Sequence, residues 1–283
     1  MEKEVVLQAG SWHAKILPHF GMNMISLSCG EKQILRSPQS MDTLIKEPYV
    51  YGMPLLFPAN RVEKGIFTFE GKSYRLPINE PARDNHLHGL MFDAPFRVME
   101  QTGSQVKAIY ENKGERYPFP FSMTITDTLT PDGLTRRLSL ENTGDTAMPY
   151  TLAYHTSFVE PESFCVPIGQ RFDCNDNYIP NGQMTELTAQ EQEYCTGTGS
   201  KGKKISGFYT AAGHDACLDE ICFKVSENFD EWVTFNAGGE QGFLCIEPQC
   251  GQVNGLNCQG GHRILLPGET QEFIVSFTVV DKP

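Results

Sequence analysis

The stretch SMTITDTLTPDGLTRRLSL, residues 122–140, decides the expected fold. Polar and apolar residues alternate over 122–129 and again over 134–140, and Pro131-Asp132-Gly133 separate the two runs. Alternation with a period of two is typical of strands that bury one face, and Pro, Asp and Gly favour tight turns. The stretch therefore predicts an antiparallel hairpin.

Two other segments show strand-like runs on either side of a turn. Residues 67–69 and 73–76 flank Glu70-Gly71-Lys72. Residues 263–266 are followed by Pro267-Gly268-Glu269 and by an alternating run that ends at residue 279. Each segment predicts a further hairpin.

Helical periodicity is weak along the whole chain. Residues 41–47 predict one helical turn, and residues 175–204, rich in Asn, Gly, Gln, Thr and Lys, predict an excursion from the sheet or a long surface loop. The sequence contains no internal repeat and no long linker. We therefore expect one all-β domain over residues 1–283, built as a large antiparallel β-sandwich.

The charge balance restricts the class of partner. The 283 residues include 23 Lys and Arg but 35 Asp and Glu, which gives a net charge of -12. Nucleic-acid binding requires a basic surface, so we expect no nucleic-acid partner and instead a small neutral molecule. The glycine patterns of nucleotide-binding loops are missing, and we expect no cofactor.

Apolar runs and cysteines bear on the compartment. No apolar stretch approaches the roughly 20 residues of a membrane span. The segment Met1–Glu4 is charged and lacks the apolar region of a signal peptide, so we expect a cytoplasmic protein without a membrane partner. The nine cysteines form no CxxC pair and are expected to be free thiols.

Glu247 is the most informative single residue. It lies in FLCIEPQ, residues 243–249, an apolar run that predicts a strand. A carboxylate in such a place is either paired or kept from bulk water for a purpose. Because Pro248 follows at once, we expect sheet pairing to stop there. A fixed carboxylate at the end of a buried strand is suited to act as a general base.

The histidines offer partners for this carboxylate. Of the seven, His155 lies in the strand-like segment 149–158, where it is either a hydrogen-bonded core residue or a general acid close to Glu247. Ninety-two residues separate the two, so only the fold can bring them together. As an acid, His155 needs a pKa near neutrality, the ordinary range of imidazole.

His86 and His88 form an HxH pair, which in a strand faces one side and is able to bind a metal. Asp93 follows at a spacing that some cupins use for an acidic ligand, but no second cupin motif is found, and we expect no metal site. Arg61, after the apolar run 54–59, is suited either to a structural salt bridge or to binding sugar hydroxyls or a carboxylate.

Five segments, in this order, together resemble the aldose 1-epimerase family, also called galactose mutarotases. They are residues 54–76 (PLLFPANRV…GIFTFEGKSYRL), 85–89 (NHLHG), 134–158, 246–249 (IEPQ) and 266–269 (LPGE). The resemblance implies a β-supersandwich, with Glu247 as general base and His155 as general acid. It also implies sugar contacts by Arg61 and His88, with Asn60 and His86 as further candidates.

The chain also departs from the better-known members of that family. Thr156-Ser157 follow the histidine where those members have Pro-Tyr, and Leu90-Met91 follow Gly89 in place of glycines. For the family's substrate-binding aspartate, Asp215 and Asp219 are the candidates. Which sugar is bound therefore stays open at this stage.

We expect an isomerase that interconverts the anomers of a hexose, present as a monomer or a homodimer. One alternative is a hexose-phosphate epimerase, which needs basic residues beside the pocket, and Arg83 and Arg97 are available. Others are a non-catalytic carbohydrate-binding protein of the same fold and a metal-dependent cupin. Phe57, Phe158 and Trp232 are candidates to stack on the sugar ring.

Overall fold

The hairpin predicted from residues 122–140 lies at the centre of a large antiparallel sheet. The structure, a computed structural model, describes residues 4–280. In it β12 (Phe121–Thr130) pairs with β13 (Gly133–Asn142), and alternate residues of β12 are buried. Met1, Glu2 and Lys3, part of the charged N-terminal segment considered above, lie outside the described residues.

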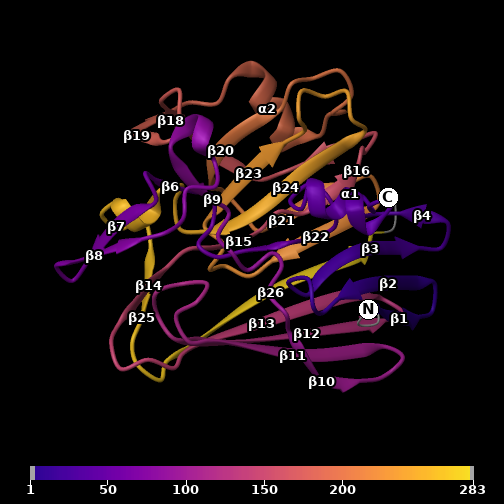
Figure 1. Cartoon of the computed structure of the whole chain (residues 1–283). Helices are drawn as coiled ribbons and strands as arrows, with labels where there is room; N and C mark the ends of the chain where they lie inside the picture. The colour runs from indigo at the N-terminus through magenta and orange to yellow at the C-terminus, as the bar shows by residue number, and fades with distance from the viewer. Residues whose placement is uncertain (1–3, 281–283) are drawn as a thin grey trace.

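The first large sheet has eight strands (Figure 1). Its order is β10 (Arg97–Gln101), β11 (Gln105–Asn112), β12, β13, β26 (Thr270–Val279), β22 (Ile221–Val225), β21 (Asp215–Leu218) and β17 (Phe164–Cys165). Every pairing in it is antiparallel.

The second large sheet also has eight strands and carries the candidate site. Its order is β19 (Pro180–Thr185), β18 (Ile168–Cys174), β20 (Ser206–Ala211), β23 (Glu231–Phe235), β24 (Phe243–Cys250), β15 (Leu152–Tyr154) and β5 (Leu55–Leu56), with β16 (Ser157–Val159) also paired to β24. In Figure 1, β20, β23 and β24 occupy the upper half of the molecule and β10 to β13 the lower half.

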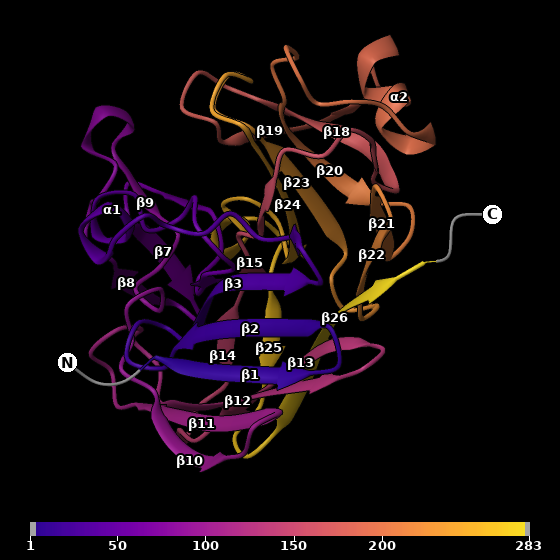
Figure 2. The ribbon, with the colours of Figure 1, turned by 90° about the vertical axis from the view of Figure 1, so that its right-hand side faces the viewer.

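Smaller elements complete the fold. A four-stranded sheet of β1 (Val5–Ala9), β2 (Trp12–Leu17), β3 (Asn23–Cys29) and β4 (Lys32–Gln33) faces the viewer in Figure 2. Three two-stranded ladders join β6 (Arg61–Glu63) to β9 (Asn85–Leu87), β7 (Ile66–Phe69) to β8 (Lys72–Arg75), and β14 (Met148–Tyr150) to β25 (Arg263–Leu265). The helices are short: α1 (Met41–Lys46), α2 (Ala189–Thr196) and the 3-10 turns Pro81–Arg83 and Gly255–Asn257.

One core joins these sheets. Trp12 of the N-terminal sheet, Phe121 and Phe273 of the first large sheet and Leu244 and Ile246 of the second belong to the same buried cluster. The all-β antiparallel sandwich is therefore confirmed. Across residues 4–280, the helices are all too short or too polar to traverse a bilayer.

The local predictions fare differently. The helix at 41–47 and the hairpin around Gly71 are confirmed. The hairpin expected around Gly268 is wrong, because β25 pairs with β14 whereas β26 pairs with β13 and β22. This turn passes the chain from one sheet to another, and local alternation does not say which partner a strand selects.

The polar segment 175–204 is an excursion that contains its own elements. β19 pairs with β18 at the sheet edge, and α2 follows it. Thr188 accepts a hydrogen bond from the Glu191 backbone and Glu191 in turn binds the Thr188 backbone, which makes a capping box. This Thr-x-x-Glu signature is visible in the sequence and marks the start of the helix that the prediction missed.

Candidate active site

Glu247 lies within a strand and not at its end. β24 is buried along its whole length, and its ladder with β23 continues past Pro248, since Trp232 opposes Pro248 and Glu231 opposes Gln249. The expectation that pairing stops at Pro248 was therefore wrong. The Ile246 N–H donates to Thr156 O, on the side of β24 that pairs with β16 and β15. Backbone groups two residues apart in a strand point to the same side, so the position where Pro248 lacks an N–H lies on that side too, between the β16 and β15 ladders. We infer that no ladder hydrogen bond is missing there.

Strand alternation sorts the side chains of β24 between core and site. Leu244 and Ile246 belong to the core cluster. Cys245, Glu247 and Gln249 therefore share the opposite face. On the neighbouring strand, Val233 opposes Glu247, so the site face of β23 carries Glu231, Val233 and Phe235.

His155 reaches this face from the irregular link between β15 and β16. Its backbone N–H donates to Pro54 O, and the Thr156 N–H donates to Tyr154 O, which bends the chain. His155 Nε2 lies 3.3 Å from Glu247 Oε1, and the two side chains are 6% and 2% exposed. The fold thus joins the two residues that the sequence separates by 92 positions.

A cavity of about 350 Å³ opens above this pair. Its polar lining consists of Asn60, Arg61, Arg83, His88, His155, Ser206, Thr234 and Glu247. Its aromatic lining consists of Tyr49, Tyr178, Phe208 and Phe235. The volume and the mixture of rings with polar groups are typical of a small-molecule site.

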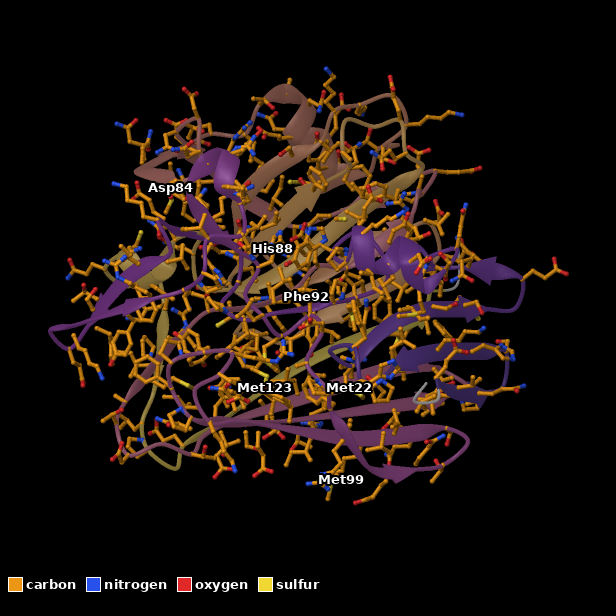
Figure 3. All side chains as sticks on the ribbon, in the orientation of Figure 1. Met22, Asp84, His88, Phe92, Met99 and Met123 are labelled. Carbon is orange, nitrogen blue, oxygen red and sulfur yellow. The ribbon has the colours of Figure 1, made fainter. Side chains whose placement is uncertain are left out.

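His88 closes one side of the cavity, and Figure 3 shows it near the centre of the molecule. Its ring lies edge-on to His155, with the ring centroids 5.2 Å apart, and against Tyr49 at 4.6 Å. Gly89 adopts a φ of +66°, and a Cβ there would clash with the Phe57 carbonyl oxygen. This requirement explains why a glycine follows the histidine.

Two arginines stand at the cavity wall and share one carboxylate. Arg61 Nε and Nη2 each donate to Glu80 at 2.9 Å, and Arg83 Nη1 donates to the same group at 3.2 Å. Both guanidinium groups lie about 5 Å from the Tyr178 ring, at 4.9 and 4.8 Å. Burial opposes ionisation of Glu80, but the hydrogen bonds from Arg61 and Asn85 and the arginine charges hold its pKa below the ordinary value.

The central pair is strongly affected by burial. Burial raises the pKa of Glu247 well above its ordinary value, with only the charge of Arg61 acting in the opposite direction. Burial also lowers the pKa of His155 to about 4, so the expectation of a value near neutrality is wrong for the free site. Between these two values, Glu247 and His155 together hold one proton.

The pair has unused hydrogen-bonding capacity. Within residues 4–280, His155 Nδ1 and His88 Nδ1 are buried without a hydrogen-bond partner. Buried polar atoms are almost always satisfied in folded proteins, so both nitrogens are exceptions. Both histidines line the cavity, and these two nitrogens are themselves shielded from its open volume.

A buried polar chain supports the cavity from below. Arg61 Nη1 donates to Asn60 Oδ1 at 3.3 Å, and Asn60 Nδ2 donates to Gln249 Oε1 at 3.4 Å. Gln249 Nε2 then donates to Glu231 Oε2 at 3.3 Å and to Gly251 O at 2.7 Å. Glu231 is 3% exposed, and burial, followed by the charge of Asp230, raises its pKa well above the ordinary value.

A sequence profile of the aldose 1-epimerase family matches residues 3–278, nearly the whole chain. The chain belongs to the aldose 1-epimerase family. Its membership confirms the resemblance that the ordered segments indicated. The activity for which this family is named is the isomerisation of a sugar.

Curated relatives of this family member match over part of their length. YihR of Escherichia coli K12, an uncharacterized protein, is 27% identical over 186 residues, or 62% of this chain and 58% of YihR. The galactose mutarotase of Rattus norvegicus is 34% identical over 120 residues, or 41% of this chain and 33% of the rat protein. The matched region thus spans less than two thirds of either relative.

Solved structures show the same fold as this aldose 1-epimerase family member. A galactose mutarotase-like protein of Clostridium acetobutylicum superposes with a TM-score of 0.91 at 23% identity, over 99% of this chain and 98% of the other. A galactose 1-epimerase of Lactobacillus acidophilus gives 0.75 at 16% identity, over 97% and 93%. At these identities the likeness concerns the fold alone.

The fold brings together five of the residues that the family resemblance indicated. Glu247, His155, Arg61, His88 and Asn60 all line the one cavity.

Three other candidates lie elsewhere. His86 is buried with its Nδ1 2.7 Å from Pro77 O and does not line the cavity. Asp215 is an exposed residue of β21, in the other large sheet, where it pairs with Lys224 at 3.2 Å. Asp219 binds Lys32. Both aspartates lie at the other large sheet, away from the cavity, and no sequence motif indicates which sheet a strand joins.

The metal site considered for His86, His88 and Asp93 does not form. Asp93 pairs with Arg116, and His86 is bonded to the backbone. Among residues 4–280, the only group of three side chains with converging metal-ligand atoms is His155, Cys245 and Glu247. A cupin-like HxH centre is therefore not supported.

The aromatic residues proposed for stacking lie in the core. Phe57 packs on Tyr117 and Phe121, Phe158 on Phe223, and the Trp232 indole donates to Gly213 O. The rings that line the cavity are those of Tyr49, Tyr178, Phe208 and Phe235. For Phe235 a signal existed, because alternation along β23 places it on the face opposite to Trp232.

Proposed function

We propose that this protein interconverts the α and β anomers of an aldose, with Glu247 as general base and His155 as general acid. The observation that carries the proposal is the 3.3 Å contact between these two groups beneath a cavity of sugar size. Membership of the aldose 1-epimerase family supports it. The rat relative named galactose mutarotase supports a hexose as substrate.

The proton count of the pair suits this reaction. Glu247 takes the proton of the anomeric hydroxyl while His155 gives its proton to the ring oxygen, and the bond between the anomeric carbon and the ring oxygen breaks. The free aldehyde rotates about the adjoining carbon–carbon bond, and the ring closes on its other face as both proton transfers reverse. One proton on the pair suffices at every stage, so no net proton is consumed.

The reactive form of the pair needs the proton on His155. In the free site, burial favours a neutral carboxyl and a neutral imidazole. Transfer of the proton across the 3.3 Å contact yields a carboxylate and an imidazolium. The charge of Arg61 favours ionised Glu247, and a bound sugar supplies hydroxyl groups that stabilise both charges.

The remaining polar groups hold the sugar. Arg61, Asn60 and His88 present donors and acceptors to its hydroxyls and ring oxygen, and the aromatic lining covers its apolar face. Orientation of the reacting atoms is a large part of the catalytic advantage of such a site.

The decisive experiment replaces Glu247 by glutamine. Glu247→Gln keeps the size of the side chain and removes its ability to accept a proton, so we expect mutarotation, followed by polarimetry, to fall by about 10²- to 10⁴-fold. Glu272→Gln, on the exposed face of β26, is the matched control and should retain full activity. A near-normal rate in Glu247→Gln, with a normal circular dichroism spectrum, would refute the assignment.

A second candidate function is epimerisation of a phosphorylated hexose. Arg83 lies in the cavity wall beside Arg61, as that function requires, whereas Arg97 lies on β10, the exposed edge strand of the other sheet. Against it, Glu80 already binds both arginines of the wall. Comparing glucose, galactose and xylose with their phosphates in wild type and Arg83→Ala decides between them. Loss confined to the phosphates would favour the second candidate.

A further inference from the structure

Beneath the cavity, three side chains of different chemistry converge. His155, Cys245 and Glu247 are all buried, and each offers a ligand atom within 4.8 Å of the other two. Cys245 and Glu247 share one face of β24, and Glu247 and His155 both line the cavity. Cys245 itself does not line the cavity and plays no part in the proton transfers proposed above.

The donor set is one that zinc prefers. Zinc is bound by cysteine thiolate, histidine nitrogen and carboxylate oxygen, and three protein ligands with one open position are common. In a tetrahedral zinc site, bond lengths of about 2.0–2.3 Å place the ligand atoms roughly 3.3–3.6 Å apart. The three ligand atoms, which lie within 4.8 Å of one another, therefore need to approach by at most about 1.5 Å, a shift within the reach of side-chain rotation.

Charge and hydrogen bonding also fit a divalent cation. A thiolate and a carboxylate together neutralise a doubly charged ion, so the loaded site carries no net charge in a buried setting. The competing contacts are few: Ser157 Oγ lies 3.2 Å from Cys245 Sγ, and His155 Nδ1 has no partner among the described residues. The cavity supplies the entry path and the fourth coordination position.

We propose that His155, Cys245 and Glu247 form an inhibitory site for zinc or a cation of similar preference. Binding displaces the thiol proton of Cys245 and the proton shared by the other two groups. The metal then occupies the carboxylate and the imidazole, so neither exchanges protons with a sugar. Metal binding stands on geometry alone, whereas the inhibition rests on the proposed function.

The test uses cobalt as a spectroscopic substitute for zinc. Metal-free wild type, titrated with Co²⁺, should bind one equivalent with thiolate-to-cobalt charge-transfer absorption, and excess Zn²⁺ should abolish that band. Affinity should rise with pH because protons leave on binding. Cys245→Ala should lose the band and weaken zinc binding at least about 10-fold, since even outer partners of a metal site change affinity by roughly 10- to 100-fold.

Cys250→Ala is the matched control. Cys250 is buried on the same strand, outside the cluster, so this variant should bind cobalt as wild type does. Wild type and Cys250→Ala should lose mutarotation on zinc addition, whereas the rate of Cys245→Ala, measured with and without zinc, should not change.

Several results would overturn the site. These are absence of the charge-transfer band in wild type, equal zinc affinity in Cys245→Ala, or loss of the band in Cys250→Ala when its melting temperature is normal. A misfolded Cys245→Ala, detected by its melting curve, is replaced by Cys245→Ser with the same expectations. If mutarotase activity is missing altogether, the cobalt titration still decides the metal site, so the two proposals fail separately.

Discussion

Among residues 4–280, one buried pair of opposite potential charge lies in the first large sheet and another lies at the site face of the second. In the first sheet Arg136 donates to both oxygens of Asp127, at 2.6 and 2.7 Å, and to Met22 O at 2.8 Å. Both side chains are 0% exposed. In the second sheet His155 and Glu247 make one contact of 3.3 Å beside an open cavity.

The difference separates a pair that stabilises the fold from a pair that is available for chemistry. The two oxygens of Asp127 are each bonded, and the one Arg136 nitrogen without a partner belongs to a guanidinium that lies 5.8 Å from the Tyr154 ring. Glu247 lacks such a bidentate partner and His155 Nδ1 has no partner. A carboxylate with both oxygens bonded resists change, whereas a carboxylate with a single contact is left for a ligand.

The largest expected effect concerns the structural pair. Asp127→Ala leaves Arg136 as an uncompensated buried charge, and we expect the free energy of unfolding to fall by about 3–5 kcal/mol. Urea denaturation followed by circular dichroism measures it. If Asp127→Ala lowered the free energy of unfolding by less than about 1 kcal/mol, the Asp127–Arg136 pair would not be a main source of stability. The proposed difference between this pair and the pair at the cavity would then be wrong.

The functional pair should show the reverse behaviour. His155→Asn removes an imidazole that has one partner, so we expect little change in unfolding but a loss of mutarotation of at least about 10²-fold, the low end for one acid–base group. Polarimetry on the refolding-competent variant measures the rate. Unchanged turnover would assign His155 to structure and leave Glu247 without its proposed acid.

The same pair predicts the pH dependence of the wild-type rate. Activity requires one proton on the pair. It should therefore fall at acid pH, around pH 4, because His155 becomes protonated there and the pair then holds two protons. It should fall again at alkaline pH, above the raised pKa of Glu247, as that proton is lost. His155→Asn should lack the acid limb, and persistence of that limb would place it on another group.

Much of the fold was readable from residues whose role is local. The alternation over 122–140 and the glycine at position 71 specify hairpins, because both partners and the turn lie close in sequence. The hairpin predicted around Gly268 is wrong, because β26 finds its partners in β13 and β22, whose pairing depends on the assembled sandwich.

The site divides in the same way. Glu247, His155 and Arg61 were predicted from motifs, whereas Tyr49, Tyr178 and Phe208 reach the cavity from segments that carry no motif. The shifted pKa of His155 was also beyond the sequence, because it arises from burial by residues of several strands. Burial is a property of the fold and not of any one segment.

Glu231 provides an intermediate case, a buried carboxyl that belongs to neither pair. Its raised pKa means that its stabilising contribution is complete below the ordinary glutamate pKa and is lost as pH rises toward the folded value. Wild type should lose about 1.4 kcal/mol per pH unit across that window relative to Glu231→Gln. Melting temperatures of both proteins at a series of pH values measure the slope.

Glu191→Gln is the matched control for that series. Burial opposes its ionisation, but hydrogen bonds from Thr188 and Tyr209 and the charge of Arg171 hold the pKa of Glu191 below its ordinary value. Its contribution is present above the ordinary pKa and is lost as pH falls, so the sign of the difference from wild type is reversed. Equal slopes for the two variants would contradict the assignment of opposite shifts.

The smallest expected effect comes from the residue next to Arg136. Arg137 points to the opposite face of β13 and donates to Glu272 at 2.8 Å, with side-chain exposures of 48% and 54%. Water and salt screen such a pair, so Arg137→Ala should change the free energy of unfolding by less than about 1 kcal/mol. Urea denaturation at low and high salt measures it beside Asp127→Ala. Equal destabilisation by the two variants would mean that charge pairing as such, and not burial with bidentate hydrogen bonding, distinguishes the structural pair from the pair at the cavity.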